Sequence, residues 1–194
     1  MAVVLAAGAG RRMGGPKALL RIGGESFLAR AARLLSRPGV RVVVAVLGHD
    51  AARVRAEAKV PAGLSLVDNE RYADGMLSSV LRGLQEAEAL AADAVLVHPV
   101  DHPLAEPATV DRVVAALEDG AVIAVPTHED RRGHPGGFAR AAWAALRKAP
   151  PERGARAVLA DHPEWVVHVA GDPGCVAGIE TPADYERWIA RVSP

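Results

Sequence analysis

The sequence predicts an α/β protein, a three-layer α/β/α sandwich around a mixed, mainly parallel sheet. Short apolar runs rich in valine, leucine and isoleucine alternate along the chain with segments of helical periodicity. Such runs are typical of strands that helices cover on both faces of a sheet. The chain has 194 residues, enough for one sizeable hydrophobic core. We therefore expect a single domain over residues 1–194.

The order of the elements follows from these patterns. The expected strands are the almost continuous apolar runs at 2–6, 41–47, 64–68, 94–98 and 121–125. Apolar residues at i, i+3, i+4 and i+7 predict helices over 77–84 and 110–117, and a weaker form of the pattern predicts helices over 27–35 and 50–58. The proline- and glycine-rich stretches 126–137 and 149–154 are expected to be loops.

A last helix is expected to begin after Thr181. Threonine is a natural N-cap, Pro182 suits the first helical turn, and Asp184 stands at the acidic position of a capping box. The predicted apolar stripe of this helix consists of Tyr185, Trp188, Ile189 and Val192.

Composition and charge exclude several classes of protein. Lys plus Arg equals Asp plus Glu at 23 each, and this balance argues against a general binder of nucleic acid or membrane surfaces. The single cysteine, Cys175, excludes an internal disulfide and a cysteine-based metal cluster. Because no apolar run reaches the ~18–20 residues that span a bilayer and no basic leader precedes the first strand, we expect a cytoplasmic protein. We see no exposed heptad or apolar helix, so we expect a monomer.

A glycine-rich loop with basic residues follows the first strand. Gly8 and Gly10 allow the backbone to turn tightly and to bring N–H groups close to an anion. Arg12 and Lys17 add positive charge. In sheets of this kind ligands bind beyond the carboxyl ends of the strands. The loop therefore predicts a site for a triphosphate.

Two familiar phosphate loops do not fit the spacing. Ala18 stands where a P-loop needs Ser or Thr, and Met13 stands at the third glycine of the dinucleotide fingerprint. The stretch that does match is L-A-A-G-x-x-x-R-M-G-x-P-K. It resembles the opening of the MobA/MocA-like nucleotidyltransferases. The resemblance implies a Rossmann-like fold of the GT-A nucleotidyltransferase type, and nucleotide contacts from Leu5, Ala6, Ala7, Gly8, Gly10, Arg12 and Lys17.

The loop after the strand at 94–98 contains Asp101 between two prolines. A carboxylate at a strand end suits Mg²⁺, which takes one or two carboxylates plus phosphate oxygens and waters. The segment resembles the family's [M/V]-x-D-x-P, which implies that Asp101 is a metal ligand. An Asx turn or a helix cap is the alternative. His102 is a candidate for substrate contact, and His98 is expected to be a hydrogen-bonded histidine at the strand end.

Further segments of the chain extend the resemblance. Residues 75–79 resemble the family's G-M-x-S-S, which reads the nucleobase, so Gly75, Ser78 and Ser79 are implied nucleotide contacts. A capped amphipathic helix is the alternative. Residues 133–138 resemble the acceptor-side G-[RHN]-P-x-x-F and contain His134.

Two candidates come from segments that depart from the family pattern. Residues 152–156 match a G-D-x-G-A-R stretch only in part, and Arg156 is either an acceptor contact or a surface ion-pair residue. Residues 178–185 resemble D-I-D-T-P-x-D-Y, with Gly178 and Glu180 in place of the two aspartates. Glu180 is the implied second metal ligand, and a favourable charge at a helix N-terminus is the alternative.

The resemblance implies transfer of a nucleotidyl group from a nucleoside triphosphate to a molybdopterin-type phosphate, with Mg²⁺ as cofactor and release of pyrophosphate. Lys17, Arg12 and Asp101 are the implied catalytic residues. The side chain of Ala7 narrows the entrance for a purine, which favours CTP over GTP. His102, His134 and Arg156 are the implied acceptor contacts.

Two alternatives stay open at the level of sequence. The first is an enzyme of the same fold that uses GTP or a sugar-phosphate acceptor. The second is a non-catalytic maturation factor that binds nucleotide or cofactor for a molybdenum hydroxylase. Gly178 and Glu180 keep the second alternative open, because they replace the aspartates of the family pattern.

Overall fold

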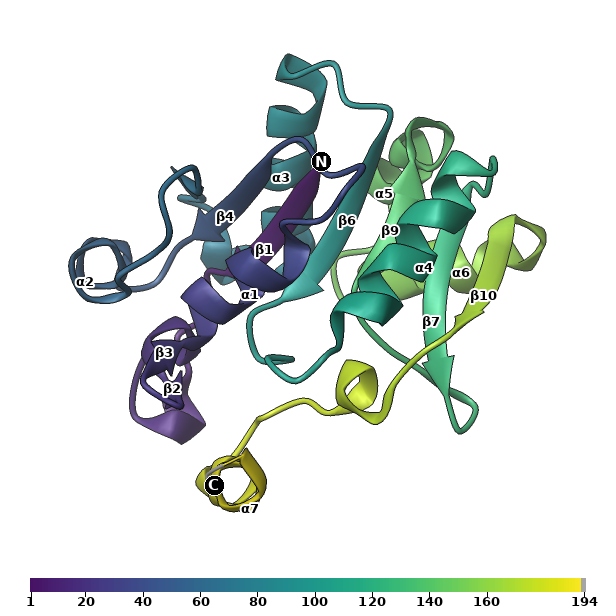
Figure 1. The fold of residues 1–194 in the computed structure, drawn as a ribbon. Coiled ribbons are helices and arrows are strands. Elements are labelled where there is room, and N and C mark those ends of the chain that lie inside the picture. The colour runs from purple at the N-terminus through teal and green to yellow at the C-terminus, as the bar shows by residue number, and fades with distance from the viewer. Residues whose placement is uncertain (193–194) are drawn as a thin grey trace.

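The computed structural model describes residues 1–192 and the side chains of residues 1–188. Its strands are β1 (Ala2–Ala6), β2 (Arg21–Ile22), β3 (Glu25–Ser26), β4 (Val43–Leu47), β5 (Ser65–Asp68), β6 (Ala94–Pro99), β7 (Ile123–His128), β8 (Arg131–Arg132), β9 (Gly136–Ala139) and β10 (Val166–Ala170). Within these residues, eight strands form one sheet in the order β10-β7-β9-β6-β1-β4-β5, with β8 on β7 (Figure 1). Strands β5, β4, β1 and β6 run parallel, and β9 runs antiparallel to both β6 and β7.

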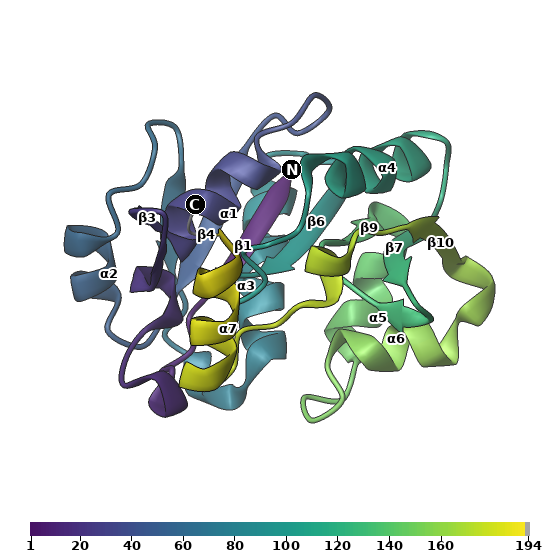
Figure 2. The same cartoon turned by 60° about the horizontal axis from the view of Figure 1, so that its bottom comes forward.

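Helices cover both faces of the sheet. They are α1 (Phe27–Leu35), α2 (Ala51–Glu57), α3 (Met76–Ala89), α4 (Pro107–Glu118), α5 (Trp143–Lys148), α6 (Ala155–Asp161) and α7 (Pro182–Val192). In β1, Val4 packs in a core cluster with α1 and α4, while Val3 and Leu5 pack with α3, α5 and α6. Figure 2 shows α1 and α4 on one side of the sheet and α3, α5 and α6 on the other. The predicted three-layer sandwich is confirmed.

The five predicted strands are present within two residues of their expected starts, but the predicted loop at 126–137 is wrong. Strand β7 continues through His128, and β8 and the start of β9 lie inside the same stretch. Glycine here serves close packing. A Cβ atom on Gly137 would lie 2.7 Å from Leu117 Cδ1 and 2.8 Å from Val113 Cγ1, so the missing side chain lets α4 approach β9. The loop at 149–154 is confirmed.

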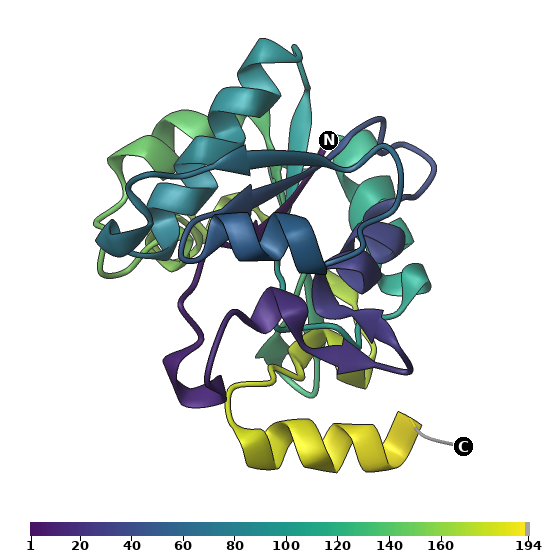
Figure 3. The same cartoon turned by 90° about the vertical axis from the view of Figure 1, so that its left-hand side faces the viewer.

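Helix α7 begins as the capping box predicts. Thr181 Oγ1 accepts a hydrogen bond from the Asp184 amide at 3.2 Å, and Asp184 Oδ2 accepts one from the Thr181 amide at 3.0 Å. The Tyr185 ring packs on Phe27, with 6.1 Å between the ring centroids, and Trp188 packs against the same core cluster. The side chains of Ile189 and Val192 lie outside the described residues. In Figure 3 this helix lies at the bottom of the molecule.

The register places three strand ends at one edge. Leu5 of β1 is level with Pro99 of β6, and Ala6 is level with Leu47 of β4. The chain segments that leave these parallel strands therefore start side by side, which brings the glycine-rich loop next to Asp101. Among the described residues, no helix is long and apolar enough to cross a membrane.

Candidate active site

The glycine-rich loop folds as a tight turn. Gly10 has φ +58°, and a Cβ atom there would lie 1.9 Å from the Gly15 carbonyl oxygen, so only glycine fits. The amides of Met13 and Gly14 donate to the carbonyls of Gly10 and Arg11 at 2.8 and 3.3 Å. These two amides are engaged within the turn, so they are not free to donate to an anion.

Beside the loop lies an open hollow of about 800 Å³. Most of the candidate residues line it: Leu5, Ala6, Ala7, Gly8, Gly10, Arg12, Lys17, Gly75, Ser79, Asp101 and Glu180. The hollow is large enough for a nucleotide-sized ligand. Ser78, His102, His134 and Arg156 are not among its lining residues.

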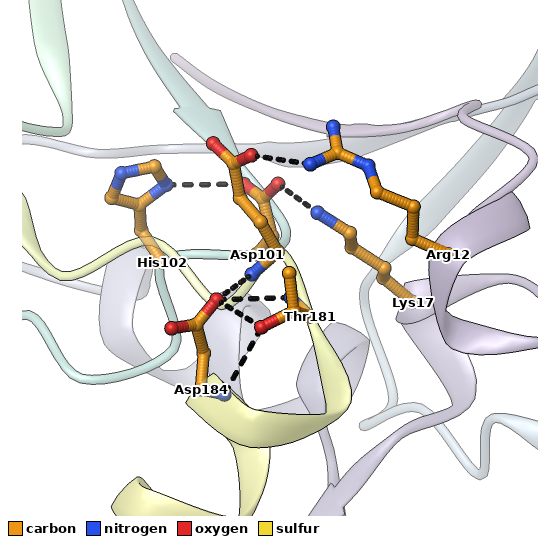
Figure 4. Close-up of polar contacts among 7 residues, drawn as sticks. Arg12, Lys17, Asp101, His102, Thr181 and Asp184 are labelled. Atoms are coloured by element: carbon orange, nitrogen blue, oxygen red, sulfur yellow. Dashed lines mark hydrogen bonds and ion pairs between the residues drawn. The ribbon is translucent and has the colours of Figure 1, made fainter.

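Lys17 and Asp101 form the central ion pair of the site. Lys17 Nζ lies 2.7 Å from Asp101 Oδ2, and His102 Nδ1 lies 3.1 Å from Asp101 Oδ1 (Figure 4). Burial raises the pKa of Asp101, but the hydrogen bonds and charges of His102 and Lys17 outweigh burial and hold that pKa below its usual range. Asp101 is therefore ionised at neutral pH.

A second pair joins the loop to the segment before α7. Arg12 Nη1 lies 3.0 Å from Glu180 Oε2, and the two side chains are 71% and 57% exposed. An ion pair this exposed contributes about 0–1 kcal/mol, so a ligand can separate it at little cost. Each predicted phosphate-binding cation is thus paired with a carboxylate that is predicted to bind metal.

The carboxylates of Asp101 and Glu180 fit a hard cation whose coordination is completed by oxygens of the substrate. Among the described residues, no group of three or more His, Cys, Asp or Glu side chains could hold a metal ion. Asp101 and Glu180 both line the hollow. Two carboxylates suffice for Mg²⁺ when phosphate oxygens and waters supply the other ligands.

The two serines of the G-M-x-S-S segment have different surroundings. The buried Asn69 donates to Ser78 Oγ at 2.8 Å and to Ser79 Oγ at 3.0 Å. Ser78 Oγ also lies 2.8 Å from the carbonyl oxygens of Arg71 and Gly75. The Ser78 hydroxyl is therefore occupied by its own turn, whereas Ser79 lines the hollow. The segment is both a capped helix start and a wall of the site.

Three histidines, His98, His102 and His134, lie near Asp101. The His102 and His134 rings are 4.6 Å apart at 70°. Burial, followed by the charges of His102 and His98, lowers the pKa of His134, and the charge of Arg156 also contributes. The expectation for His98 is not met, because neither ring nitrogen has a partner at good hydrogen-bond geometry, and contact with the His102 backbone raises the His98 pKa less than burial lowers it. The side chain is fully buried on strand β6, and burial lowers its pKa to about 3.

Sequence reasoning missed the two aromatic residues that line the hollow, His49 and Tyr72. His49 follows the end of β4, and Tyr72 lies in the turn before α3. The carboxyl-end rule for parallel strands could have indicated His49. Nothing in the local pattern around Tyr72 distinguishes it from an ordinary turn residue.

Comparison with known proteins points to one family. The family model described as "MobA-like NTP transferase domain" matches residues 2–166. The nicotine blue oxidoreductase of Paenarthrobacter nicotinovorans is 39% identical over 140 residues, covering 69% of this chain and 67% of that protein. The 2-C-methyl-D-erythritol 4-phosphate cytidylyltransferase of Saccharopolyspora erythraea is 40% identical, and the match covers 65% of this chain and 58% of that protein.

A molybdenum cofactor guanylyltransferase of Cereibacter sphaeroides is 37% identical, covering 63% of this chain and 60% of that protein. The matched region thus spans about three fifths to two thirds of these relatives. The crystal structure of Rv0371c from Mycobacterium tuberculosis has a TM-score of 0.81 at 27% identity, covering 97% and 96% of the two chains. Its complex with manganese has a TM-score of 0.73 at 26% identity, covering 98% of each.

Proposed function

The chain belongs to the MobA-like NTP transferase family, and from this premise we propose that it transfers CMP from CTP to a phosphate-bearing acceptor and releases pyrophosphate. The observation that carries the proposal is the Lys17–Asp101 pair at 2.7 Å, which lines the hollow together with the glycine-rich loop. The ammonium group of Lys17 can bind phosphate, and the ionised carboxylate of Asp101 can bind a metal ion. Both groups lie beside the loop where we propose that the triphosphate binds.

The reaction needs position and charge from the protein rather than a nucleophilic side chain. An oxygen of the acceptor phosphate forms a bond to the α-phosphorus, the bond between the α-phosphorus and its bridging oxygen to the β-phosphate breaks, and pyrophosphate leaves with the charge. The acceptor phosphate is already ionised near neutral pH, so no general base is required. Lys17 stabilises charge at the α-phosphate, and Arg12 holds the β- and γ-phosphates.

Nucleotide binding exchanges the partners of both ion pairs. Lys17 and Arg12 turn from carboxylates to phosphates, and Asp101 and Glu180 become available for metal. Mg²⁺, when bound, would neutralise charge on the phosphate oxygens, and these two carboxylates would hold it. The manganese complex of the similar Rv0371c protein supports a divalent metal in this chain.

The proposed nucleotide, CTP, and the proposed acceptor, a molybdopterin-type phosphate, are each supported by residues of this chain and by a relative. Ala7 lines the hollow, and we propose that its methyl group narrows the space for a purine. The cytidylyltransferase relative supports CTP. One relative is named a molybdenum cofactor guanylyltransferase, which supports a molybdopterin-type acceptor. His102, His134 and Arg156 are the proposed acceptor contacts. His102 contacts Asp101, the His134 ring packs on His102, and the charge of Arg156 acts on His134, while none of the three lines the hollow.

Thermal unfolding with Mg²⁺ and each of CTP, GTP, ATP and UTP tests the nucleotide. A ligand at 100 times its Kd adds about 2.7 kcal/mol, which is roughly 5–11 °C for a domain of this size. We expect a Mg²⁺-dependent shift that is largest with CTP and absent in Asp101→Ala. A larger shift with GTP would contradict the choice of base. A protein that no nucleotide stabilises, and that binds a molybdenum hydroxylase instead, would support the maturation-factor alternative.

A further inference from the structure

The hollow has an aromatic wall, formed by Tyr72 and His49, to which the proposed chemistry assigns no role. The two ring centroids are 6.0 Å apart, and the rings meet edge to face at 66°. Tyr72 is 38% exposed and the neighbouring Met76 is 64% exposed, although both are large apolar side chains. Both also line the hollow. Exposed apolar surface at a ligand site indicates contact with an apolar face of the ligand.

The backbone beneath Tyr72 holds the ring in a fixed place. A Cβ atom on Gly48 would lie 2.5 Å from Tyr72 Cβ and 2.8 Å from Ala7 Cβ, so the root of Tyr72 packs on the Gly48 backbone close to Ala7. The bare glycine is what allows this approach. The ring therefore begins beside the residue proposed to limit the size of the base.

The turn that carries Tyr72 is fastened at both ends. The Asn69 amide donates to the Leu47 carbonyl at 2.8 Å, at the end of β4. The Asn69 side chain, 5% exposed, donates to Ser79 Oγ at the start of α3 and accepts from the Arg71 amide at 3.0 Å. The Tyr72 amide donates to the Asn69 carbonyl at 3.3 Å. A ring on such a turn is positioned before a ligand arrives, which reduces the entropy lost on binding.

We propose that Tyr72, in edge-to-face contact with His49, is the stacking surface for the nucleobase. This inference rests on the proposed function and adds to it a binding residue for the base. Tyr72 lines the hollow with Ala7 and Ser79, whereas the proposed acceptor residues do not line it. The aromatic wall therefore belongs to the nucleotide. Every base has an apolar face, so stacking contributes affinity without choosing among bases.

Removing the Tyr72 ring should therefore weaken the binding of ligands that contain a base and leave the binding of the triphosphate group unchanged. Base–aromatic stacking corresponds to about 5- to 150-fold in affinity. Tyr72→Ala should weaken Mg·CTP and Mg·GTP by one common factor in this range and leave their order unchanged. Tyr72→Phe keeps the ring face and should bind like the wild type. Mg·triphosphate, which has no base, should bind all three proteins equally.

Calorimetric titration of the three proteins with Mg·CTP, Mg·GTP and inorganic Mg·triphosphate tests the inference, with circular dichroism as the check on folding. The expected pattern is a loss for both nucleotides in Tyr72→Ala alone, with triphosphate unaffected. An equal loss of triphosphate affinity in Tyr72→Ala would overturn the inference, because it would show that Tyr72 only supports the loop.

Two other outcomes separate this inference from the proposed function. Wild-type protein that binds triphosphate but binds CTP no more tightly would overturn the stacking surface and leave the phosphate site standing. Wild-type protein that binds neither ligand would overturn both.

Discussion

Replacing His98 with leucine should remove a sensitivity to acid that the buried imidazole gives the fold. The ring is fully buried, and burial, followed by the charge of His102, lowers its pKa from 6.5 to about 3. In the unfolded chain the pKa returns to its ordinary value. Between pH 6.5 and pH 3 the unfolded state therefore binds a proton that the folded state does not, and the free energy of unfolding falls as the pH falls.

The magnitude follows from the two pKa values. At pH 5 the medium is 1.5 pH units below the unfolded pKa of His98 and well above the folded one, which corresponds to about 2 kcal/mol. At pH 7.5 the same effect is close to zero. His98→Leu changes the packing equally at both pH values, so the pH-dependent part of the difference reports the imidazole alone.

Thermal or urea unfolding of both proteins at pH 7.5 and pH 5 measures this difference. Wild type should lose about 2 kcal/mol more than His98→Leu on acidification, roughly 4–8 °C in Tm for a domain of this size. Equal losses in the two proteins would refute the reasoning, because His98 would then take up its proton in the folded state as readily as in the unfolded chain.

The remaining predictions concern the loop and the central ion pair. Lys17→Ala and Asp101→Ala should each lower the rate of nucleotidyl transfer by about 10²–10³ with the circular dichroism spectrum unchanged. The control is Lys148→Ala, which removes an exposed lysine on α5 and should keep the wild-type rate. Wild-type rates in Lys17→Ala and Asp101→Ala would show that these two residues take no part in catalysis. Gly10→Ala should weaken Mg·CTP by at least about tenfold in calorimetry, because its Cβ atom meets a backbone oxygen at 1.9 Å. Gly14→Ala is the matched control, with φ +75° but nothing within 4 Å of the added Cβ atom, and equal losses in the two variants would contradict the steric argument.

The sequence predicted the buried part of the sheet best. Strands β1, β4 and β6 are nearly continuous apolar runs because helices cover both of their faces. Strand β10 was not predicted. It lies at the edge of the sheet, where apolar residues such as Val167 can be exposed, here to 44%. The sequence of β10 therefore lacks a regular alternation of buried apolar and exposed polar residues. Helix α5 has six residues, too few for a helical repeat to stand out.

The elements of the candidate site could be found from sequence, but not their pairing. The glycine-rich loop and Asp101 each follow a strand, so the carboxyl-end rule is sufficient to place them at one edge of a parallel sheet. Nothing local could pair Arg12 with Glu180, which is 168 residues away and is brought in by the segment before α7. Ser78 and Ser79 looked equivalent in the sequence. They differ because successive residues of a helix point about 100° apart, which leaves Ser79 buried on the side of the hollow.

Transfer of label from CTP tests the central claim most directly. The protein is incubated with Mg²⁺, CTP labelled on the α-phosphate and molybdopterin, with sugar 1-phosphates as competing acceptors and Lys17→Ala as the control. We predict that label appears on molybdopterin with one pyrophosphate released per transfer, and that neither occurs in the control. Label on a sugar phosphate would correct the acceptor, whereas intact CTP under conditions that saturate the hollow would contradict the transferase.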